Sequence, residues 1–403
     1  METTKLEQIA SDFKTKIEKG LEENGQDFQC IPTLINLRKK DIKDGKILVL
    51  DWGGTNLRAA IVGFKNGEPV ILEVKEKRLS AKETEGFNQD DLFREMADLI
   101  SELKELDETV THIGYCFSYP TKSLPKGEAK LTEWTKDMKI EGMVGEPVGE
   151  PFLKYLQATK LQLKHIAVIN DTVACLLAGR SKSGYDAYIG IIVGTGKNTA
   201  AIMQTDSIPK ISKLSKEEKE TKGIGKEIAI NLESGNPRPK YLTIYDEIVD
   251  ANSDNKGKQL LEKAVSGKYL SEILKSIYPK TEFDEEFDAK TLNAMLNYPD
   301  IYKDDYVATA KWIYERSAKL VAASLAGLVL VLLSHTPTIK RILLTAEGSL
   351  FWSKNRKDQD YSEMVEKELH CLLNNFGYED VRVDLHRLDN ANLIGAAIAA
   401  LSF

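Results

Sequence analysis

One sequence pattern occurs twice in this chain, first over residues 48–62 and again over residues 189–203. Each copy has an apolar run, a Gly-Thr turn, an asparagine and a second apolar run: LVLDWGGTNLRAAIV in the first and IGIIVGTGKNTAAIM in the second. Two short matches can arise by chance, but self-similarity within one chain is also the mark of a duplicated structural unit. The pattern predicts two similar halves, each with a strand–turn–strand hairpin of a kind that can hold a phosphate.

Strand-like and helix-like segments alternate along the rest of the chain, which predicts the α/β class. Period-2 apolar patterns predict strands at 46–50, 57–64, 70–74, 112–117, 165–169, 185–193, 198–203, 339–344 and 381–385. Period-3.6 patterns predict helices at 5–23, 91–106, 149–159, 172–178, 360–376 and 391–401, with mostly helical patterns over 242–335. Asn66-Gly67 predicts a hairpin turn, because both residues tolerate positive φ. The polar stretches 121–150 and 210–226 are expected to be loops on the surface.

The composition excludes several classes of function. The chain has 403 residues and a formal net charge of −7, from 55 Lys and Arg against 62 Asp and Glu. Non-specific nucleic-acid binding and attachment to an anionic membrane both need a surplus of basic residues, so neither partner is expected. The four cysteines form no C-x-x-C pair, and the N-terminal stretch has no apolar core of a signal peptide. A cytoplasmic protein with reduced thiols is therefore expected.

An uncharged apolar segment, residues 320–333, tests that expectation. A membrane span needs about 18 or more such residues, and this run is shorter and has charged residues at its start. It predicts a buried helix packed between other layers, with membrane insertion as the alternative.

Three glycine-containing turns are candidates for phosphate binding. Residues 51–56 read Asp-Trp-Gly-Gly-Thr-Asn, and glycine lets backbone N–H groups approach phosphate oxygens closely. Asp51 at the strand end is of the type that holds Mg²⁺ through water. Because this turn joins strand to strand, it is neither a P-loop nor a Rossmann turn. Gly194-Thr195-Gly196 is the second turn, and Gly348-Ser349 is the third, where a helix N-terminus is expected to meet a nucleotide. An ordinary tight turn is the alternative for the first two.

Other polar residues are candidates for catalysis or ligand binding. Asn170-Asp171-Thr172 follows an apolar strand, where α/β proteins bind ligands, so Asp171 is a candidate general base; a helix N-cap is the alternative. Thr135 and Lys136 lie in a long loop, where function concentrates, although Lys136 taken alone is expected first to be a solvent-exposed charge. Glu233 and Glu262 would by default be surface carboxylates. No metal-binding pattern involves the five histidines.

Taken together, these motifs resemble the hexokinase family, within the actin-like sugar-kinase and ATPase superfamily. Nine ordered matches carry the resemblance: LDWGGTNLR (50–58), FSYP (117–120), LTEWTK (131–136), INDTVACLLAG (169–179), IIVGTGKN (191–198), INLESG (230–235), YDEIVD (245–250), GKQLLEKAVSGKYL (257–270) and AEGSL (346–350). They cover nearly the whole chain after its first helix.

The resemblance implies an α/β, two-lobed actin-like ATPase (ribonuclease H-like) fold, with a duplicated βββαβα core and a cleft between the lobes. The small lobe is expected to comprise residues 46–168 plus 389–403. The large lobe is expected to comprise residues 1–45 plus 169–388. The cleft would close on the sugar.

The implied activity is ATP-dependent phosphorylation of the 6-hydroxyl of a hexose, with glucose as the first candidate and glycolysis as the setting. A catalytically weak sugar-binding regulator on the same fold is the alternative. ATP and Mg²⁺ are the implied cofactors. The implied catalytic residues are Asp171 as the base, with Lys136 and Arg58. The implied sugar ligands are Ser118, Thr135, Lys136, Asn170, Asp171, Asn198, Glu233 and Glu262. The implied ATP-binding residues are Gly53, Gly54, Thr55, Asn56, Arg58, Gly194, Thr195, Gly196, Gly348 and Ser349, with Asp51 holding Mg²⁺ through water.

The sequence departs from the family pattern in three places. Lys197 follows the second turn where the family usually has threonine, which is expected to add a charge near phosphate. FSYPT, with Tyr119, replaces the commoner F-S-F-P-C. LDNANLIGAA, at 388–397, lacks the usual acidic, Ser/Gly-rich run, which leaves the adenine contacts unassigned.

Overall fold

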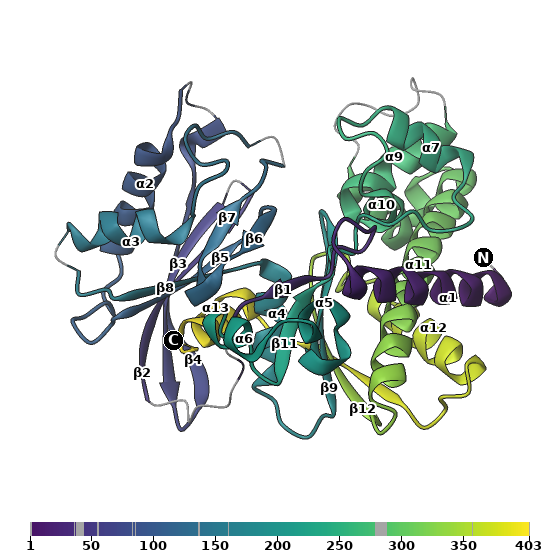
Figure 1. Cartoon of the computed structure of the whole chain (residues 1–403). Coiled ribbons are helices and arrows are strands. Elements are labelled where there is room, and N and C mark those ends of the chain that lie inside the picture. Colours follow the sequence, from purple (N-terminus) through teal and green to yellow (C-terminus); the bar gives the residue numbers. More distant parts are fainter. Residues whose placement is uncertain are drawn as a thin grey trace. The chain divides into compact units, whose positions relative to one another are not determined.

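The computed structural model describes residues 2–35, 37, 44–54, 56–82, 84, 86–135, 138–159, 161–278, 288–356 and 358–402. The chain packs into two compact units, each made of three separate segments (Figure 1). Unit 1 comprises Met1–Cys30, Gly184–Thr199 and Leu232–Arg387. Unit 2 comprises Ile31–Ser183, Ala200–Asn231 and Leu388–Phe403.

The units and the lobes expected from the sequence are both discontinuous, but their bounds differ. Unit 2 includes residues 31–45, 169–183 and 200–231, which the sequence interpretation assigned to the large lobe. The lobe boundaries stay a prediction, because compactness in one conformation does not define which residues move together.

Unit 2 is built on a five-stranded sheet. In spatial order its strands are β4 (Glu68–Arg78), β3 (Asn56–Lys65), β2 (Gly45–Gly53), β5 (His112–Phe117) and β8 (His165–Ile169). β2, β3 and β4 are antiparallel, whereas β2, β5 and β8 are parallel. The predicted turn at Asn66-Gly67 is confirmed, with φ of 53° and 81°.

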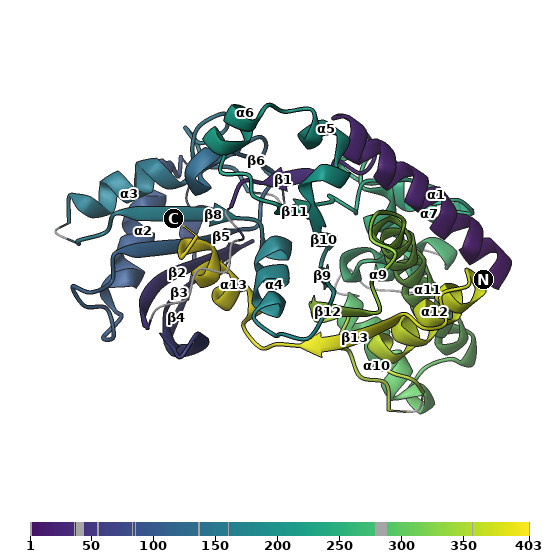
Figure 2. The same cartoon turned by 60° about the horizontal axis from the view of Figure 1, so that its bottom comes forward.

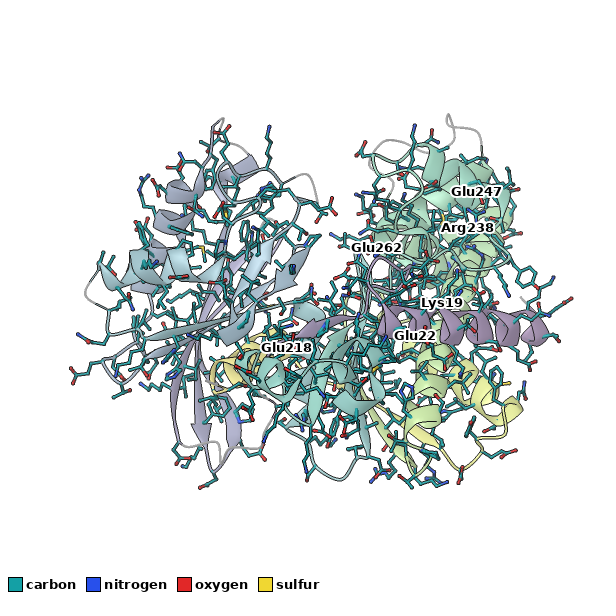
Figure 3. All side chains as sticks on the ribbon, in the orientation of Figure 1. Lys19, Glu22, Glu218, Arg238, Glu247 and Glu262 are labelled. Carbon is teal, nitrogen blue, oxygen red and sulfur yellow. The ribbon has the colours of Figure 1, made fainter. Side chains whose placement is uncertain are left out.

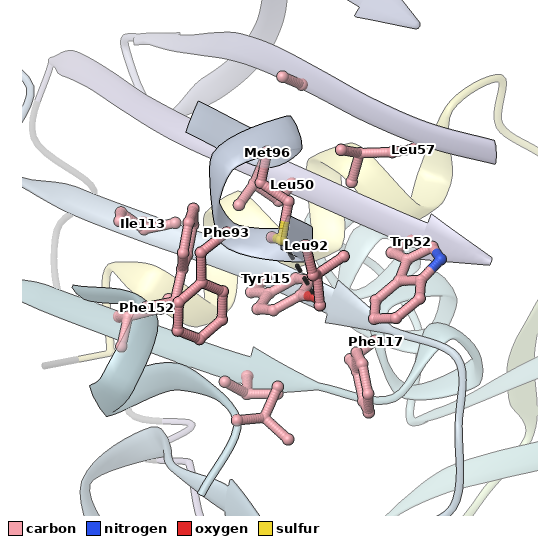
Figure 4. Packing of buried hydrophobic residues seen from close by; sticks show 14 of the residues in the cluster. Leu50, Trp52, Leu57, Leu92, Phe93, Met96, Ile113, Tyr115, Phe117 and Phe152 are labelled. Atoms are coloured by element: carbon pink, nitrogen blue, oxygen red, sulfur yellow. Dashed lines mark hydrogen bonds between the residues drawn. The ribbon is translucent and has the colours of Figure 1, made fainter. Parts of the chain in front are cut away.

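One face of this sheet packs against α2 (Gln89–Ser101) and α3 (Gly149–Gln157) through a large apolar cluster. Figure 4 shows its centre, where the Tyr115 hydroxyl donates to Met96 Sδ at 3.9 Å. α2 ends earlier than the predicted residue 106. The N–H groups of Lys104 and Glu105 bond to the Glu73 carboxylate on β4 instead of continuing the helix. This long-range acceptor is not visible in the local pattern.

The other face of the sheet is covered by α4 (Asp171–Arg180) and α13 (Ala391–Ala400), which Figure 2 shows beside each other. Two glycines permit this packing. A Cβ on Gly395 would lie 1.8 Å from the Ala174 carbonyl oxygen of α4, and one on Gly114 of β5 would lie 2.1 Å from the Ala396 carbonyl oxygen. Segments that are far apart in the sequence therefore pack together in this unit.

Smaller elements complete unit 2. The predicted loop region 121–150 contains a short hairpin of β6 (Thr121–Ser123) and β7 (Ala129–Leu131). β1 (Ile31–Thr33) and the end of β10 (Lys197–Gln204) pair antiparallel with β11 (Glu227–Asn231). The expectation that 210–226 is a loop was wrong. The segment includes most of α5 (Pro209–Ser212) and all of α6 (Lys216–Thr221), which a Ser215/Glu218 capping box starts.

Unit 1 contains three parallel strands, with β12 (Arg341–Glu347) between β9 (Ala187–Val193) and β13 (Arg382–Arg387). β10 begins in this unit, directly after the second glycine turn. Its helices are α1 (Thr3–Glu22), α7 (Ile244–Ala251), α8 (Leu260–Val265), α9 (Gly267–Ile277), α10 (Ala289–Asn297), α11 (Asp304–His335) and α12 (Tyr361–Asn375). Short 3₁₀ turns in the two units lie at Ser80–Lys82, Pro125–Gly127, Thr205–Ser207 and Pro299–Ile301.

The apolar segment 320–333 forms the second half of α11, and each of its side chains is buried. By length and composition α11 is able to cross a membrane, but 89 % of its most apolar window is buried inside the protein. Neighbouring helices supply that cover: a Cβ on Gly327 would lie 2.8 Å from the Ala10 carbonyl oxygen of α1. The prediction of a buried core helix is confirmed.

Candidate active site

In unit 2, three predicted site segments lie at the same edge of the sheet. Asp51 of β2 is opposite Cys116 of β5, and Cys116 is opposite Ile169 of β8. Ser118 directly follows β5, and Asp171 lies two residues after the end of β8. Since neighbouring strands are about 4.8 Å apart, the parallel ladder gathers these residues at the carboxyl ends of adjacent strands. This is the edge where open α/β sheets bind ligands.

The junction of β8 and α4 shows which residue caps the helix. Asn170 is the N-cap, and its Oδ1 accepts the Thr172 N–H at 2.9 Å. Asp171 is the first residue of the helix, and its own Oδ1 accepts the Thr172 N–H at 2.7 Å and the Thr172 hydroxyl at 3.3 Å. Asn170 therefore performs the capping that the alternative reading had given to Asp171 or Thr172. Asp171 presents a half-buried carboxylate at the strand end.

Asp51 and Arg58 form an ion pair across the first hairpin. Arg58 donates to Asp51 Oδ2 through Nε, at 3.0 Å, and through Nη2. Its Nη1 donates to Asn390 Oδ1 at 3.0 Å, directly before α13. The predicted phosphate-binding arginine thus orients the predicted magnesium-binding carboxylate. The sequence did not single out Asn390, because nothing local indicates that residue 390 lies beside residue 58.

The first glycine turn is an open hairpin between β2 and β3. Gly53 pairs with Asn56, and Gly54 has φ of 77°, which only glycine adopts without strain. Among the described residues other than its chain neighbours, none has an atom within 4 Å of the position that a Cβ on Gly54 would take, whereas Ser118 Oγ lies 3.5 Å from that position on Gly53. The predicted phosphate residues Gly53 and Gly54 are therefore adjacent to the predicted sugar ligand Ser118. Thr55 lies outside the described residues.

The loop that carries Thr135 is held through its neighbour Trp134. The Trp134 ring packs on Trp52 and Tyr119, at centroid separations of 5.7 Å and 4.9 Å, and its Nε1 donates to the Ile140 carbonyl at 3.1 Å. Thr135 is half-buried beside this cluster. Lys136 lies outside the described residues.

In unit 1, the second turn meets the late-strand segment. The Gly194 N–H bonds to the Gly196 carbonyl at 2.9 Å, so the turn is tight, and Thr195 at its tip is exposed. A Cβ on Gly194 would lie 3.4 Å from Gly348 Cα and 3.6 Å from Ser349 N. Gly348 has φ of 108°, and a Cβ there would lie 2.2 Å from the Val193 carbonyl oxygen, so glycine is required.

The expected helix N-terminus at Gly348-Ser349 is absent from the described residues 347–356. This segment is a turn, with the Trp352 N–H bonded to the Gly348 carbonyl at 3.3 Å, and the next helix, α12, begins at Tyr361. The Phe351 N–H instead bonds to the Val193 carbonyl at 2.9 Å and fixes the turn to the end of β9. The segment is thus placed against the second glycine turn without a helix dipole.

Three predicted sugar ligands of unit 1 also lie together. The Glu262 Oε2 accepts the Lys197 N–H at 2.8 Å, and a Cβ on Gly196 would lie 2.6 Å from the same oxygen. Asn198 Oδ1 accepts the Ser234 N–H at 3.1 Å, next to Glu233. Glu233 has φ of 50°, an uncommon conformation for a residue other than glycine. Figure 3 labels Glu262 in this region.

Lys197 does not lie where the sequence interpretation placed its charge. Its side chain is 2 % exposed, and its Nζ bonds to Ser234 Oγ at 2.8 Å and to Ser324 Oγ of α11 at 3.0 Å. Burial lowers the pKa of the Lys197 amine from 10.5 to about 7, with Glu262 opposing the shift. The expected cation near phosphate is therefore a buried core residue, because alternation along β10 directs this side chain inward.

The described residues contain no group of three or more His, Cys, Asp or Glu side chains that could hold a metal ion. A metal bound by one carboxylate through water needs no such group. Asp51, buried at a strand end with both Arg58 contacts on Oδ2, fits that kind of site.

Two glycine hairpins, each set in a unit with parallel strands, and polar residues at strand ends agree with the sugar-kinase class that the sequence motifs indicated. The chain belongs to the hexokinase family: one hexokinase family model matches residues 1–181, and a second matches residues 188–307 and 304–402. It is a hexose-phosphorylating kinase.

Curated relatives and solved structures match nearly the whole chain. Hexokinase-1 of Arabidopsis thaliana is 28% identical over 99% of this chain and 88% of its own length. Hexokinase-9 of Oryza sativa subsp. japonica is 26% identical over 99% of this chain and 86% of its own. The fold is similar to that of a Schistosoma mansoni hexokinase complexed with glucose, with a TM-score of 0.78 and 23% identity over 100% of this chain and 96% of that one.

Proposed function

We propose that this kinase transfers the γ-phosphoryl group of ATP to the 6-hydroxyl of a hexose, with glucose as the preferred substrate. The observation that carries this proposal is the junction of β8 and α4, where Asn170 caps the helix and Asp171 is left for chemistry. Phosphoryl transfer depends on positioning and on stabilising charge, and a carboxylate that accepts the hydroxyl proton completes it.

Asp171 acts as the general base. Both contacts from Thr172 fall on Oδ1, so they fix the carboxylate plane, and Oδ2 is the oxygen that receives the proton of the sugar hydroxyl. Asn170, whose Oδ1 is used in capping, offers its amide N–H₂ group to a sugar oxygen.

The hexose is recognised by a polar set in each unit. Ser118, Thr135, Lys136, Asn170 and Asp171 come from unit 2, and Asn198, Glu233 and Glu262 come from unit 1. Carboxylates accept from sugar hydroxyls, whereas amides and hydroxyls both donate and accept, so such a set rejects sugars that leave a buried polar group unpaired. We propose that the lobes expected from the sequence close on the bound sugar, which excludes water as a competing phosphoryl acceptor.

ATP is held by the two glycine turns. Gly53, Gly54, Thr55 and Asn56 bind the phosphates from the first turn, Gly194, Thr195 and Gly196 bind them from the second, and Gly348 and Ser349 bind the adenosine. Asp51 holds Mg²⁺ through water, oriented by Arg58. When bound, the ion neutralises charge on the phosphate oxygens. An acidic protein needs these local groups, because its net charge repels ATP.

We further propose a cytoplasmic location and a role at the entry of glucose into glycolysis. None of the four cysteines forms a disulfide, which is typical of a reducing compartment; three are buried and Cys371 is exposed.

A coupled ADP-release assay with the purified chain tests the proposal. Glucose, mannose, fructose, N-acetylglucosamine and glycerol are compared at fixed Mg-ATP. We expect hexose-dependent ADP release with the highest kcat/KM for glucose. Glucose binding without turnover of any of these compounds would favour the weakly catalytic regulator.

A further inference from the structure

The carbonyl oxygen of Gly54 accepts two hydrogen bonds from buried aromatic side chains. Trp52 Nε1 donates to it at 2.9 Å, and the Tyr119 hydroxyl donates to it at 3.0 Å. Trp52 lies two residues earlier on β2, whereas Tyr119 follows β5, so the donors come from neighbouring parallel strands. A turn carbonyl with two side-chain donors is held in direction as well as in position.

Both donors are also connected through the backbone to Ser118, which is proposed to bind the sugar. The Ser118 N–H bonds to the Trp52 carbonyl at 3.1 Å, and Ser118 directly precedes Tyr119. Ser118 Oγ also faces Gly53. The end of β5, which carries Ser118, and the glycine hairpin are therefore joined through Trp52 and Tyr119 and not only through the sheet ladder.

Packing fixes the two donors. Trp52 is 0 % and Tyr119 1 % exposed, and their ring centroids are 5.0 Å apart in an edge-on arrangement. Phe117 and Trp134 pack on both rings. Burial raises the pKa of the Tyr119 hydroxyl, so it stays protonated and remains a donor. Neither ring can rotate away without disrupting the cluster.

We propose that Trp52 and Tyr119 are positioning residues that hold the first phosphate-binding hairpin in register with the sugar-binding end of β5, through their shared acceptor, the Gly54 carbonyl. This proposal rests on the proposed function, because it assigns the hairpin to ATP and Ser118 to the sugar. It also gives a use to the hydroxyl by which Tyr119 differs from the phenylalanine usual in the family. Neither residue touches the reacting atoms.

Sharing one acceptor has a consequence that can be measured. When one donor is removed, the carbonyl still has the other, so the hairpin stays in place. When both are removed, the carbonyl has neither side-chain donor and the hairpin is free to turn toward water. The effects of the two substitutions on phosphoryl transfer should therefore be much larger together than the product of the single effects.

The test compares Trp52→Phe, Tyr119→Phe and the double variant with Tyr115→Phe. Tyr115 is the matched control, since it lies in the same core but its hydroxyl contacts Met96 instead of the hairpin. We expect each single variant to keep kcat/KM for ATP within about threefold, and the double variant to lose about 10- to 100-fold, since displacements of about 1 Å can cost about 100-fold in rate. Glucose affinity measured by calorimetry should stay within about twofold in all variants.

Stability and local exchange separate positioning from folding. Thermal melts should give every variant a Tm above the assay temperature. Hydrogen exchange of a peptide over residues 50–60 should speed up in the double variant only. If Trp52→Phe fails to fold, Trp52→Met, which also lacks the indole donor, replaces it in the comparison, and unchanged exchange of this peptide in a folded double variant contradicts the proposal. Multiplicative effects in a folded double variant also overturn it. Absence of hexose-dependent turnover in the unmodified chain would instead overturn the proposed function.

Discussion

The side-chain nitrogen of Lys197 lies 3.0 Å from Ser324 Oγ, which joins the start of β10 to the middle of the core helix α11. The same nitrogen lies 2.8 Å from Ser234 Oγ, beside Glu233 in its left-handed conformation. The backbone N–H of Lys197 meanwhile bonds to Glu262. This buried lysine therefore bonds directly to one proposed sugar ligand, Glu262, and to Ser234, the neighbour of another, Glu233.

Lys197 should make the free energy of unfolding depend on pH. Its pKa is about 7 in the folded protein against 10.5 when unfolded, so between these values the unfolded chain binds more protons. Stability from this group therefore rises with pH across that window, by at most about 1.4 kcal/mol per pH unit. In urea titrations from pH 7.5 to 9.5, the stability of the unmodified chain minus that of Lys197→Met should increase with pH. Lys164→Met, on the surface, is the control, and a pH-independent difference for Lys197→Met would contradict the prediction.

The direction of the Lys197 side chain could not be predicted from the sequence. The Gly-Thr-Gly turn and the strand after it follow from local chemistry, and the structure has both. Whether the next side chain faces a ligand or the core depends on the strand's register and on α11, which begins more than a hundred residues later. Contacts of that sequence separation leave no local trace. For the same reason the sequence did not predict the Arg58–Asn390 contact or the early end of α2, where the Lys104 N–H bonds to Glu73 of β4.

Local patterns were sufficient for most of the fold. β5 and β8 have the predicted bounds, because apolar alternation and flanking polar residues define them. α6 was missed because its sequence is almost wholly charged, so no apolar face marks it, and only the Ser215/Glu218 capping box could have indicated it. For Asp171, base and cap were both reasonable from sequence. The structure gives the N-cap to Asn170, and the role of Asp171 as base stays a prediction.

Asp171→Asn should abolish most of the turnover while leaving sugar binding intact. The amide keeps an oxygen to accept the Thr172 N–H, so the start of α4 is preserved, but it cannot take up a proton. We expect kcat to fall by about 10²- to 10⁴-fold, the usual size of a general-base effect, with the calorimetric Kd for glucose within about threefold. Glu150→Gln, an exposed carboxylate in the first turn of α3, is the control. Near-normal turnover in Asp171→Asn would remove this residue from the chemistry.

Asp51→Asn should raise the Mg²⁺ concentration needed for half-maximal activity. The substitution removes the charge that faces the hydrated ion and also breaks the ion pair that orients Arg58. Loss of an outer partner of a metal typically costs about 10- to 100-fold in affinity, and we expect a shift of about that size at saturating glucose. Asp107→Asn, which loses only a surface pair with Lys46, should leave the Mg²⁺ curve unchanged. An unchanged curve for Asp51→Asn would place the ion elsewhere.

Gly395→Ala should destabilise unit 2 although alanine is the better helix former. In an open helix the change would stabilise by about 1 kcal/mol. Here the new Cβ would lie 1.8 Å from the Ala174 carbonyl oxygen, a backbone atom that moves only if α13 and α4 separate. We expect a net loss of about 2–4 kcal/mol in urea titrations, as for other overpacked cores, together with a lower kcat because α4 carries Asp171. Gly45→Ala is the control, since apart from its chain neighbours no atom of the part of the chain that the structure describes lies within 4 Å of its added Cβ. A stability gain in Gly395→Ala would show that the helices are not held at this separation.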